Sequence, residues 1–263
     1  MKIIHIAGYS NSGKTVLIKK LVKILEDKYP GKTGVIKHLG HHTYDLNPGK
    51  DMTGHFENGA KFVAGIDSNK SVTYSGENDL YKILGHYSDA GIKYAVIEGF
   101  KKFSFRKVCL GELNAENCIL KNPDVSEIVK SLDRFDDFFT MQGIIRDLKE
   151  NTELPKTGCI ITFNGIVREI TGEEKTPFLE FNDTDKLKRI ISGVTEDIKS
   201  RKGILGARIH HNSGRINAGD DITYIAVAAE HRVEGFAAVQ NAIDRIKSEL
   251  HDGENRIQKF TYP

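Results

Sequence analysis

The sequence predicts an α/β fold in two parts, a mostly parallel sheet with flanking helices followed by an α+β domain. In the first half, short apolar runs alternate with helical periods, which is typical of βαβ units. After about residue 140, strands with every second residue apolar replace these runs and favour an antiparallel sheet. A length of 263 residues accommodates two ordinary domains. We therefore divide the chain into residues 1–138 and 139–263.

The first domain is expected to contain short buried strands separated by helices. Apolar runs predict strands at residues 3–7, 35–37, 72–74, 94–97, 108–110 and 118–120. Helical periods predict helices at 15–27 and 80–89. Pro123 and Asp124 begin a further helix, which we expect to extend to about residue 138.

The second domain is expected to combine half-buried strands with amphipathic helices. A short helix is predicted at 144–149, and strands at 207–211 and 222–229. Another strand is predicted by the alternating residues Cys159, Ile161, Phe163 and Gly165. Two amphipathic helices carry apolar faces made by Leu187, Ile190, Ile191, Val194 and Ile198 and by Phe236, Val239, Ile243, Ile246 and Leu250.

Composition excludes several classes of function. Lys plus Arg total 38 against 36 Asp plus Glu, a net charge of +2, so no global basic field favours nucleic acid or a membrane surface. No apolar run approaches the ~18 residues of a membrane helix, and the first residues lack an export signal, so we expect a cytoplasmic protein. Cys109, Cys118 and Cys159 are odd in number and widely spaced, which favours free thiols.

The clearest motif is a phosphate-binding loop. The sequence GYSNSGKT matches the pattern G-x-x-x-x-G-K-S/T between a predicted strand and a predicted helix. Its glycines let the backbone N–H groups point inward at phosphate oxygens, and the helix adds its positive dipole end. The fold expected here is therefore P-loop NTPase-like. The predicted nucleotide-binding residues are Gly8, Tyr9, Ser10, Asn11, Ser12, Gly13, Lys14, Thr15 and Val16.

A Mg²⁺ site is predicted beside this loop. Lys14 would reach the β- and γ-phosphates, and the Thr15 hydroxyl would ligate the metal. Glu98 ends a predicted strand, where its carboxylate would meet the metal or a metal-bound water. The alternative is that Glu98 caps a helix or forms an ion pair.

A polar segment follows the strand at 35–37 and has the composition of a functional loop. We expect it to respond to nucleotide or substrate, and the alternative is a zinc site. Its candidate side chains are His38, His41, His42, His55, Asp45 and Asp51.

The first domain resembles the MobB family of molybdopterin-guanine dinucleotide biosynthesis adapters. The resemblance is carried by Gly-Tyr-Ser-x-x-Gly-Lys-Thr, Val-Ile-Lys-His, Asp-x-x-Pro-Gly-Lys-Asp, Glu-Asn-Gly-Ala and Val-Ile-Glu-Gly-Phe-Lys, in that order. It implies a dimeric GTP-binding adapter with weak hydrolysis that assists a MobA-like molybdopterin guanylyltransferase. The spacing of the phosphate-binding loop alone indicates a nucleoside triphosphate. The preference for guanine comes from the resemblance, because the sequence has no convincing Asn/Thr-Lys-x-Asp motif that would recognise the base.

Polar residues at strand ends indicate a second site in the C-terminal half. Arg168 closes one predicted strand, His231 and Arg232 follow another, and Lys247 lies on the last predicted helix. Guanidinium and ammonium groups suit an anion, so these side chains would converge on one. The alternative is that they are solvated surface charges.

The second domain resembles the MoaE family, the large catalytic subunit of molybdopterin synthase. The resemblance is carried by Gly-x-x-x-x-Phe-x-Gly-x-Val-Arg, Leu-Glu-Phe, Gly-Arg-Ile-x-x-Gly-Asp and Ala-Val-Ala-Ala-x-His-Arg-x-x-x-Phe-x-Ala. It implies an α/β hammerhead fold, a homo-oligomer, and sulfur transfer from a small ubiquitin-like, MoaD-like carrier to a pterin substrate, cyclic pyranopterin monophosphate. Arg168 then matches the arginine beside the substrate, His231 and Arg232 the phosphate-contacting pair, and Lys247 the first active-site lysine.

Two departures from the MoaE pattern leave other interpretations open. The family's His-Arg-x-Gly is His211-Asn212-Ser213-Gly214 here, and its Pro-x-Trp-Lys is absent, so Lys259, or else Arg256, would replace the second lysine. One alternative is a nucleotide-switched scaffold with a non-catalytic second domain. Another is an unrelated P-loop kinase or ATPase.

Overall fold

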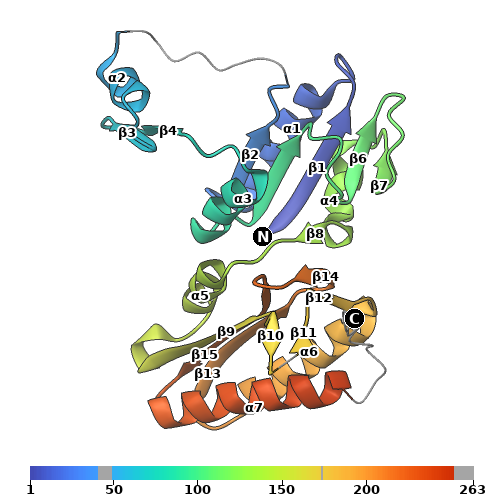
Figure 1. The fold of residues 1–263 in the computed structure, drawn as a ribbon. Coiled ribbons are helices and arrows are strands. Elements are labelled where there is room, and N and C mark those ends of the chain that lie inside the picture. Colours follow the sequence, from blue (N-terminus) through green and yellow to red (C-terminus); the bar gives the residue numbers. More distant parts are fainter. Residues whose placement is uncertain (41–48, 173, 252–263) are drawn as a thin grey trace. The chain divides into compact units, whose positions relative to one another are not determined.

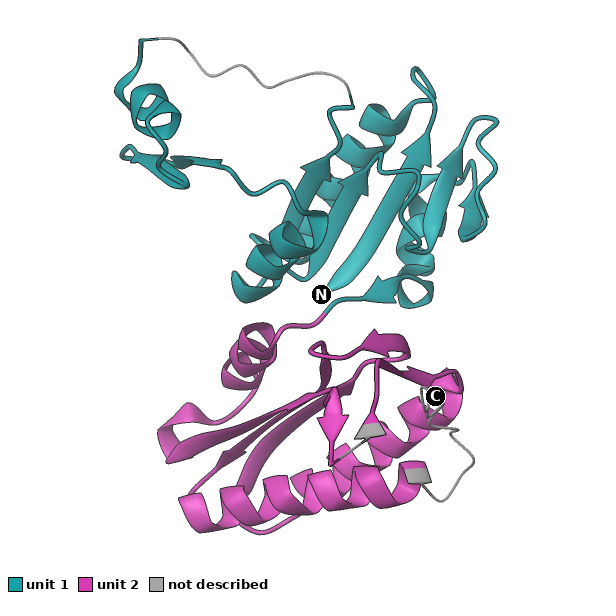
Figure 2. Cartoon of the chain, viewed as in Figure 1, with its two compact units in different colours: residues 1–138 teal, residues 139–263 magenta. Residues whose placement is uncertain are grey.

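The computed structural model describes residues 1–40, 49–172 and 174–251 (Figure 1). The chain divides into two compact units, Met1–Phe138 and Phe139–Pro263 (Figure 2). Each unit has its own hydrophobic core. Within the described ranges, no helix is both long and apolar enough to cross a membrane.

The first unit is built on a sheet of strand order β2-β5-β1-β6-β7, all parallel, with β8 pairing antiparallel to β1. The mostly parallel sheet predicted from the apolar runs is confirmed. Its strands are β1 Lys2–Gly8, β2 Thr33–Lys37, β5 Tyr94–Glu98, β6 Lys107–Leu110, β7 Cys118–Lys121 and β8 Asp136–Asp137.

Helices cover both faces of this sheet, because successive strand residues point to opposite sides. Helices α1 Lys14–Lys28 and α4 Val125–Lys130 pack on the face that carries Ile4 and Ile6. Helix α3 Leu80–Asp89 packs on the opposite face, where Ile3 lies.

The predicted long helix ending near residue 138 is wrong. Asp124 and Glu127 begin α4 with a capping box, but the helix ends at Lys130 and a 3₁₀ turn, η1 Leu132–Arg134, follows. Phe135 is fully buried in the core, and Asp136 accepts hydrogen bonds from the Arg106 backbone N–H and Nε. These tertiary contacts hold the segment extended as β8.

The strand predicted at 72–74 exists, but not in the parallel sheet. Strand β4 Ser71–Ser75 pairs antiparallel with β3 Phe62–Ile66 in a separate hairpin, preceded by helix α2 Asp51–Glu57. The Asp67 carboxylate accepts hydrogen bonds from the backbone N–H groups of Asn69 and Lys70, which closes a tight hairpin turn. This local turn pairs β4 with β3 rather than with a main-sheet strand.

The second unit has a central antiparallel sheet of order β13-β15-β9, and this α+β architecture confirms the predicted one. Its strands are β9 Cys159–Ile166, β13 Ile204–His211 and β15 Asp221–Ala229. Helices α6 Thr184–Lys199 and α7 Arg232–His251 pack on one face, and α5 Met141–Glu150 packs on the other.

Four short strands and a 3₁₀ turn complete the part of the second unit that the structure describes, and none of them was predicted. They are β10 Ile170–Thr171, β11 Glu174–Lys175, β12 Phe178–Phe181, β14 Gly214–Asn217 and η2 Leu154–Lys156. β10 pairs with β11, and β12 pairs with β14.

Candidate functional site

The predicted phosphate-binding loop curls between β1 and α1. Asn11 and Gly13 have positive φ angles of 61° and 83°, which turn the loop back on itself. A Cβ at Gly8 would lie 2.4 Å from Ser12 Oγ and 3.2 Å from the Leu110 carbonyl oxygen, so a larger residue would require the Ser12 side chain and its surroundings to shift. Tyr9, Ser10, Asn11 and Val16 are exposed around the loop, which leaves it accessible to a ligand.

Lys14 points its ammonium group into this loop. Nζ donates hydrogen bonds to the carbonyl oxygens of Tyr9, at 2.6 Å, and Gly8, at 3.2 Å. Burial is the main cause that lowers the pKa of Lys14; Glu98 opposes it, and the charges of Lys101 and Lys37 add to the lowering. A negative ligand in the loop would offset both effects, because its charge would stabilise the ammonium form of Lys14.

Thr15 and Glu98 lie together at the predicted metal position. The Thr15 hydroxyl donates to Glu98 Oε1 at 3.5 Å, and Glu98 is 7% exposed. Lys37 Nζ lies 3.8 Å from the same carboxylate oxygen, so the ion pair considered as an alternative is also present. Hydroxyl and carboxylate oxygens are suitable ligands for Mg²⁺, and this pair fits such an ion.

The histidine-rich segment is described only in part. His41, His42 and Asp45 lie outside the described residues, and the ring of His38 packs at a tilt against Phe100 with ring centroids 4.6 Å apart. Among the residues whose placement is given, no group of three His, Cys, Asp or Glu side chains is arranged to hold a metal.

The three cysteines are free thiols. Burial raises the pKa of Cys109 to about 12, and a hydrogen bond with Cys118 adds to this shift. Because the thiolate is the reactive form, Cys109 is unsuited to nucleophilic chemistry.

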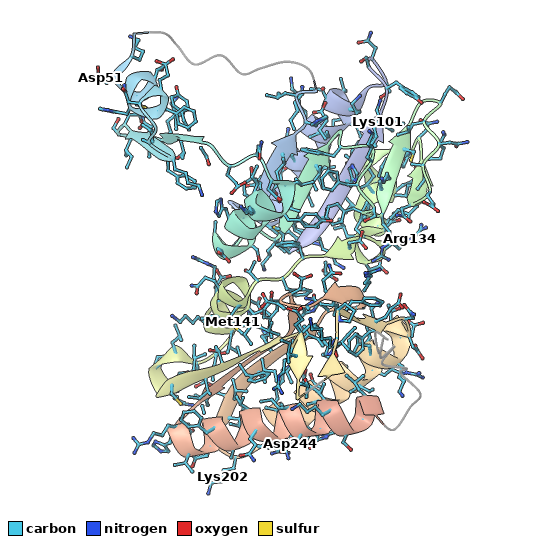
Figure 3. The ribbon with its side chains drawn as sticks, in the orientation of Figure 1. Asp51, Lys101, Arg134, Met141, Lys202 and Asp244 are labelled. Atoms are coloured by element: carbon cyan, nitrogen blue, oxygen red, sulfur yellow. The ribbon has the colours of Figure 1, made fainter. Side chains whose placement is uncertain are left out.

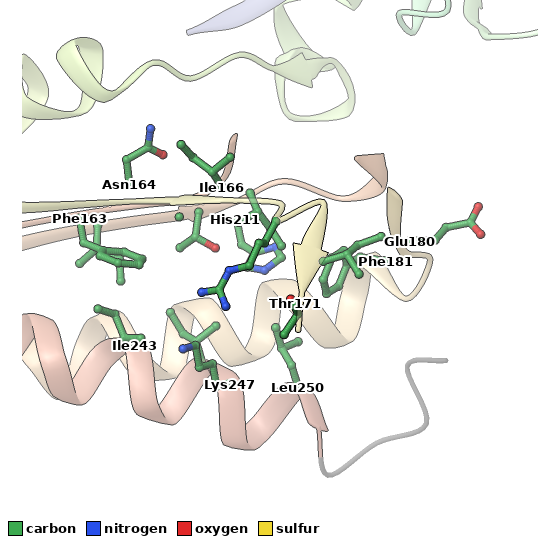
Figure 4. A pocket seen from close by; sticks show the side chains of 17 residues that line it. Phe163, Asn164, Ile166, Thr171, Glu180, Phe181, His211, Ile243, Lys247 and Leu250 are labelled. Carbon is green, nitrogen blue, oxygen red and sulfur yellow. The ribbon is translucent and has the colours of Figure 1, made fainter. Parts of the chain in front are cut away.

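The second unit contains a cavity of about 440 Å³ on the face of the central sheet that α7 covers (Figure 4). Arg168 and Lys247 both line it, so these two predicted residues are brought together. Lys247 reaches the wall because Ile243, Lys247 and Leu250 follow one another on the same face of α7. Apolar side chains make up much of the remaining wall, among them Phe163, Leu179, Phe181, Ile222 and Ile225.

His211 is a cavity residue that the site prediction did not include. It is 7% exposed, its Nδ1 pairs with the Asn212 carbonyl oxygen at 2.7 Å, and burial lowers its pKa, so the ring is neutral at pH 7. Its ring packs edge-on against Phe181 with centroids 4.7 Å apart. His211 belongs to the His-Asn-Ser-Gly segment and Phe181 to the Leu-Glu-Phe motif, but nothing in the spacing of these two segments indicates that the two side chains meet.

His231 and Arg232 do not line this cavity, so of the four predicted basic residues Arg168 and Lys247 meet there within one chain and the other two do not. His231 immediately precedes α7 and Arg232 is its first residue, whereas Lys247 lies near the other end. At 1.5 Å per residue the two basic positions are roughly 22 Å apart along the helix axis. A single chain therefore presents two separate cationic groups.

The structure describes one of the two departures from the MoaE pattern. Asn212 takes a structural role, since its side chain pairs with His210 Nε2 at 2.9 Å and donates to the Asp221 carbonyl oxygen at 2.7 Å. Lys259 and Arg256 lie outside the described residues.

Comparison with known proteins assigns both halves of the chain. The family model "Molybdopterin guanine dinucleotide synthesis protein B", MobB, matches residues 3–131, and the family model "MoaE protein" matches residues 139–249. A probable molybdopterin synthase of Haloferax volcanii is 26% identical over 255 residues, which are 94% of this chain and 93% of that protein.

Two shorter relatives each match one half. The molybdopterin synthase catalytic subunit of Halalkalibacterium halodurans is 30% identical over 133 residues, 46% of this chain and 85% of that protein. A putative molybdopterin-guanine dinucleotide biosynthesis adapter protein of Methanocaldococcus jannaschii is 34% identical over 130 residues, 49% of this chain and 51% of that protein. The chain belongs to the MoaE family of molybdenum cofactor biosynthesis through its second half, and its first half is similar to MobB proteins.

Proposed function

We propose that the second unit transfers sulfur from the thiocarboxylated C-terminus of a small ubiquitin-like carrier to cyclic pyranopterin monophosphate. The observation that carries this proposal is the cavity of about 440 Å³ that Arg168 and Lys247 share. The Arg168 guanidinium would bind the cyclic phosphate through paired hydrogen bonds, and the Lys247 ammonium would stabilise charge that develops on the thiocarboxylate. The apolar wall would exclude water from the sulfur donor.

Oligomerisation would explain the separation of the basic residues. His231 and Arg232 lie at the opposite end of α7 from Lys247, so they would act on the same substrate only if a second copy of the chain supplied them. We therefore propose a homo-oligomer in which one protomer contributes the cavity and its partner contributes the two basic residues.

We propose that the first unit binds GTP with Mg²⁺ and assists a MobA-like guanylyltransferase, with weak hydrolysis of its own. Lys14 would exchange its carbonyl partners for phosphate oxygens, and Thr15 and Glu98 would hold the metal. When bound, the metal would neutralise charge on the β- and γ-phosphates. The guanine preference follows from the MobB relationship, and no base-reading motif in the chain supports it independently.

One observation favours a second candidate, a nucleotide-switched scaffold whose second unit makes no product. Asn212 stands where the MoaE pattern has an arginine, and its hydrogen bonds commit it to the protein's own structure. A cation that the family pattern contains is thereby lost at this position.

The test is conversion of cyclic pyranopterin monophosphate to molybdopterin by the purified chain with a thiocarboxylated carrier. Lys247→Ala is expected to reduce conversion by roughly a hundredfold or more, because it removes charge stabilisation at the reacting group. Lys188→Ala is the matched control, since Lys188 is exposed on α6 and does not line the cavity. Unchanged conversion in Lys247→Ala would contradict the sulfur-transfer proposal.

The same assay addresses Lys259, which we propose as the second lysine of the site. Loss of conversion in Lys259→Ala as well as Lys247→Ala would support a working synthase with a relocated lysine. A wild-type chain that binds GTP but converts no substrate would favour the scaffold instead.

A further inference from the structure

We propose that Lys101 binds the terminal phosphate of a nucleoside triphosphate and so lets the first unit distinguish a triphosphate from a diphosphate. This inference rests on the nucleotide site proposed above and adds a residue outside the phosphate-binding loop. Lys101 follows Glu98 by three positions, in the loop between β5 and β6 (Figure 3).

The Lys101 ammonium lies against the phosphate-binding loop. Its Nζ is 4.2 Å from the centroid of the Tyr9 ring, and Tyr9 is the residue that follows Gly8 in the loop. Glu98 and Thr15 would hold the metal ion, which would neutralise charge on the β- and γ-phosphates of a bound nucleotide, so Glu98 indicates the side of the site nearest those phosphates. The loop that leaves Glu98 therefore approaches the site from the side of the terminal phosphate.

Buried side chains hold the backbone that carries Lys101. Gly99 and Phe100 have positive φ angles of 95° and 45°, which turn the chain sharply after β5. His5 Nε2 pairs with the Gly99 carbonyl oxygen at 2.7 Å, and Lys107 Nζ donates to the Lys101 carbonyl oxygen at 3.2 Å. His5 and Lys107 are both buried, so the loop is anchored from within the unit and Lys101 starts from a fixed position.

The charges around the site favour a more negative ligand. Lys14, Lys37 and Lys101 contribute positive charge here: burial is the main cause that lowers the pKa of Lys14, and the charges of Lys101 and Lys37 add to that lowering. The Glu98 carboxylate lies beside these lysines, with its Oε1 atom 3.8 Å from Lys37 Nζ. This excess of positive charge matches the additional phosphate that distinguishes a triphosphate.

The contact with Tyr9 is weak enough to be exchanged. Tyr9 is 55% exposed, and a cation over an exposed ring is held less strongly than one in a charge-assisted hydrogen bond to phosphate. Lys101 would therefore leave the ring for a phosphate oxygen when a triphosphate enters.

The test is calorimetric titration of the full chain with GTP and with GDP, each in the presence of Mg²⁺. Lys101→Ala is expected to weaken GTP binding about tenfold and to change GDP binding less than about twofold, because only GTP has the phosphate that Lys101 contacts. Lys101→Arg keeps the charge and is expected to retain most of the GTP preference. Lys102→Ala is the matched control, since Lys102 is the next residue and is also exposed.

The possible results distinguish failure of the role proposed for Lys101 from failure of the nucleotide site itself. An unchanged ratio of GTP to GDP affinity in Lys101→Ala, with normal wild-type binding, would overturn the role of Lys101 alone. A wild-type chain that binds neither nucleotide would overturn the nucleotide site itself. Thermal unfolding followed by circular dichroism would verify that Lys101→Ala is folded as the wild type is, because the substitution removes only an exposed side chain.

Discussion

Thr15 and Glu98 are 83 positions apart in the sequence, yet the Thr15 hydroxyl lies 3.5 Å from Glu98 Oε1. Two different elements bring them together. Thr15 lies in the first turn of α1, directly after the phosphate-binding loop, and Glu98 is the last residue of β5. Because β1 and β5 are adjacent and parallel, their carboxyl ends meet at one edge of the sheet.

The first prediction concerns metal dependence at this pair. Glu98→Gln is expected to leave nucleotide binding without Mg²⁺ largely intact and to remove most of the additional affinity that Mg²⁺ provides, because an amide is a weaker ligand than a carboxylate. Titration of GTP with Mg²⁺ and with EDTA measures both quantities. Glu57→Gln is a control at an exposed glutamate on α2. An equal response to Mg²⁺ in wild type and Glu98→Gln would exclude Glu98 from the metal site.

The second prediction concerns acid stability. His5 is fully buried, and burial is the main cause that lowers its pKa to about 4, although Gly99 accepts a hydrogen bond from it. Unfolded chains hold a histidine of pKa about 6.5, so between pH 6.5 and 4 the unfolded state binds more protons than the folded state. The free energy of unfolding therefore falls on acidification, by about 2 kcal/mol between pH 6.5 and 5 from His5.

Urea unfolding from pH 7 to 5, followed by circular dichroism, measures this loss. His5→Gln keeps a group able to donate to the Gly99 carbonyl and is expected to flatten the pH dependence by about 2 kcal/mol over that range. His55→Gln, at an exposed position, is expected to leave the dependence unchanged. Parallel pH profiles for His5→Gln and wild type would contradict this assignment.

Much of the first site was predictable because its signals are local in sequence. The loop from Gly8 to Thr15 lies between a strand and a helix whose periodicities are clear, and parallel pairing then places Glu98 at the same edge. The path of residues 131–138 was not predictable in this way. There the burial of Phe135 and the contact of Asp136 with Arg106 override a helical pattern, and both depend on tertiary structure.

The second site was predictable only in part. Arg168 and Lys247, which the sequence predicts to meet at one anion, line the same cavity, but its wall also includes β10 and β12, which are too short for any periodic pattern. The position of Arg232 could have been inferred, since a residue four turns away on the same helix as Lys247 cannot reach the same point.

The third prediction concerns the close contact between Gly158, which precedes β9, and Glu230, which follows β15. A Cβ at Gly158 would lie 2.1 Å from the Glu230 carbonyl oxygen, a backbone atom that cannot move freely. Gly158→Ala is therefore expected to destabilise the second unit by about 1–3 kcal/mol while nucleotide binding by the first unit persists. Gly193→Ala, in an exposed part of α6 with open space around it, is expected to stabilise by up to about 1 kcal/mol. Equal melting temperatures for the two variants would contradict the steric argument.

The fourth prediction tests whether two copies build one site. Lys247→Ala and Arg232→Ala are each expected to be inactive alone, since each removes a charge from every site. If a partner supplies Arg232, co-refolding the two variants in equal amounts gives mixed dimers with one intact and one doubly defective site. Such a mixture is expected to regain about a quarter of wild-type conversion, because half of the dimers are mixed and each has one working site.

The control for this mixing experiment is the double variant Lys247→Ala/Arg232→Ala co-refolded with wild type. There a mixed dimer has one altered residue in each site, so the mixture is expected to retain only about a quarter of the activity, from the dimers that are wild type throughout. If both residues acted within one chain, the same mixture would retain about half, and the two single variants would regain nothing on mixing. The pair of mixtures therefore distinguishes a shared site from a self-contained one without knowledge of the subunit arrangement.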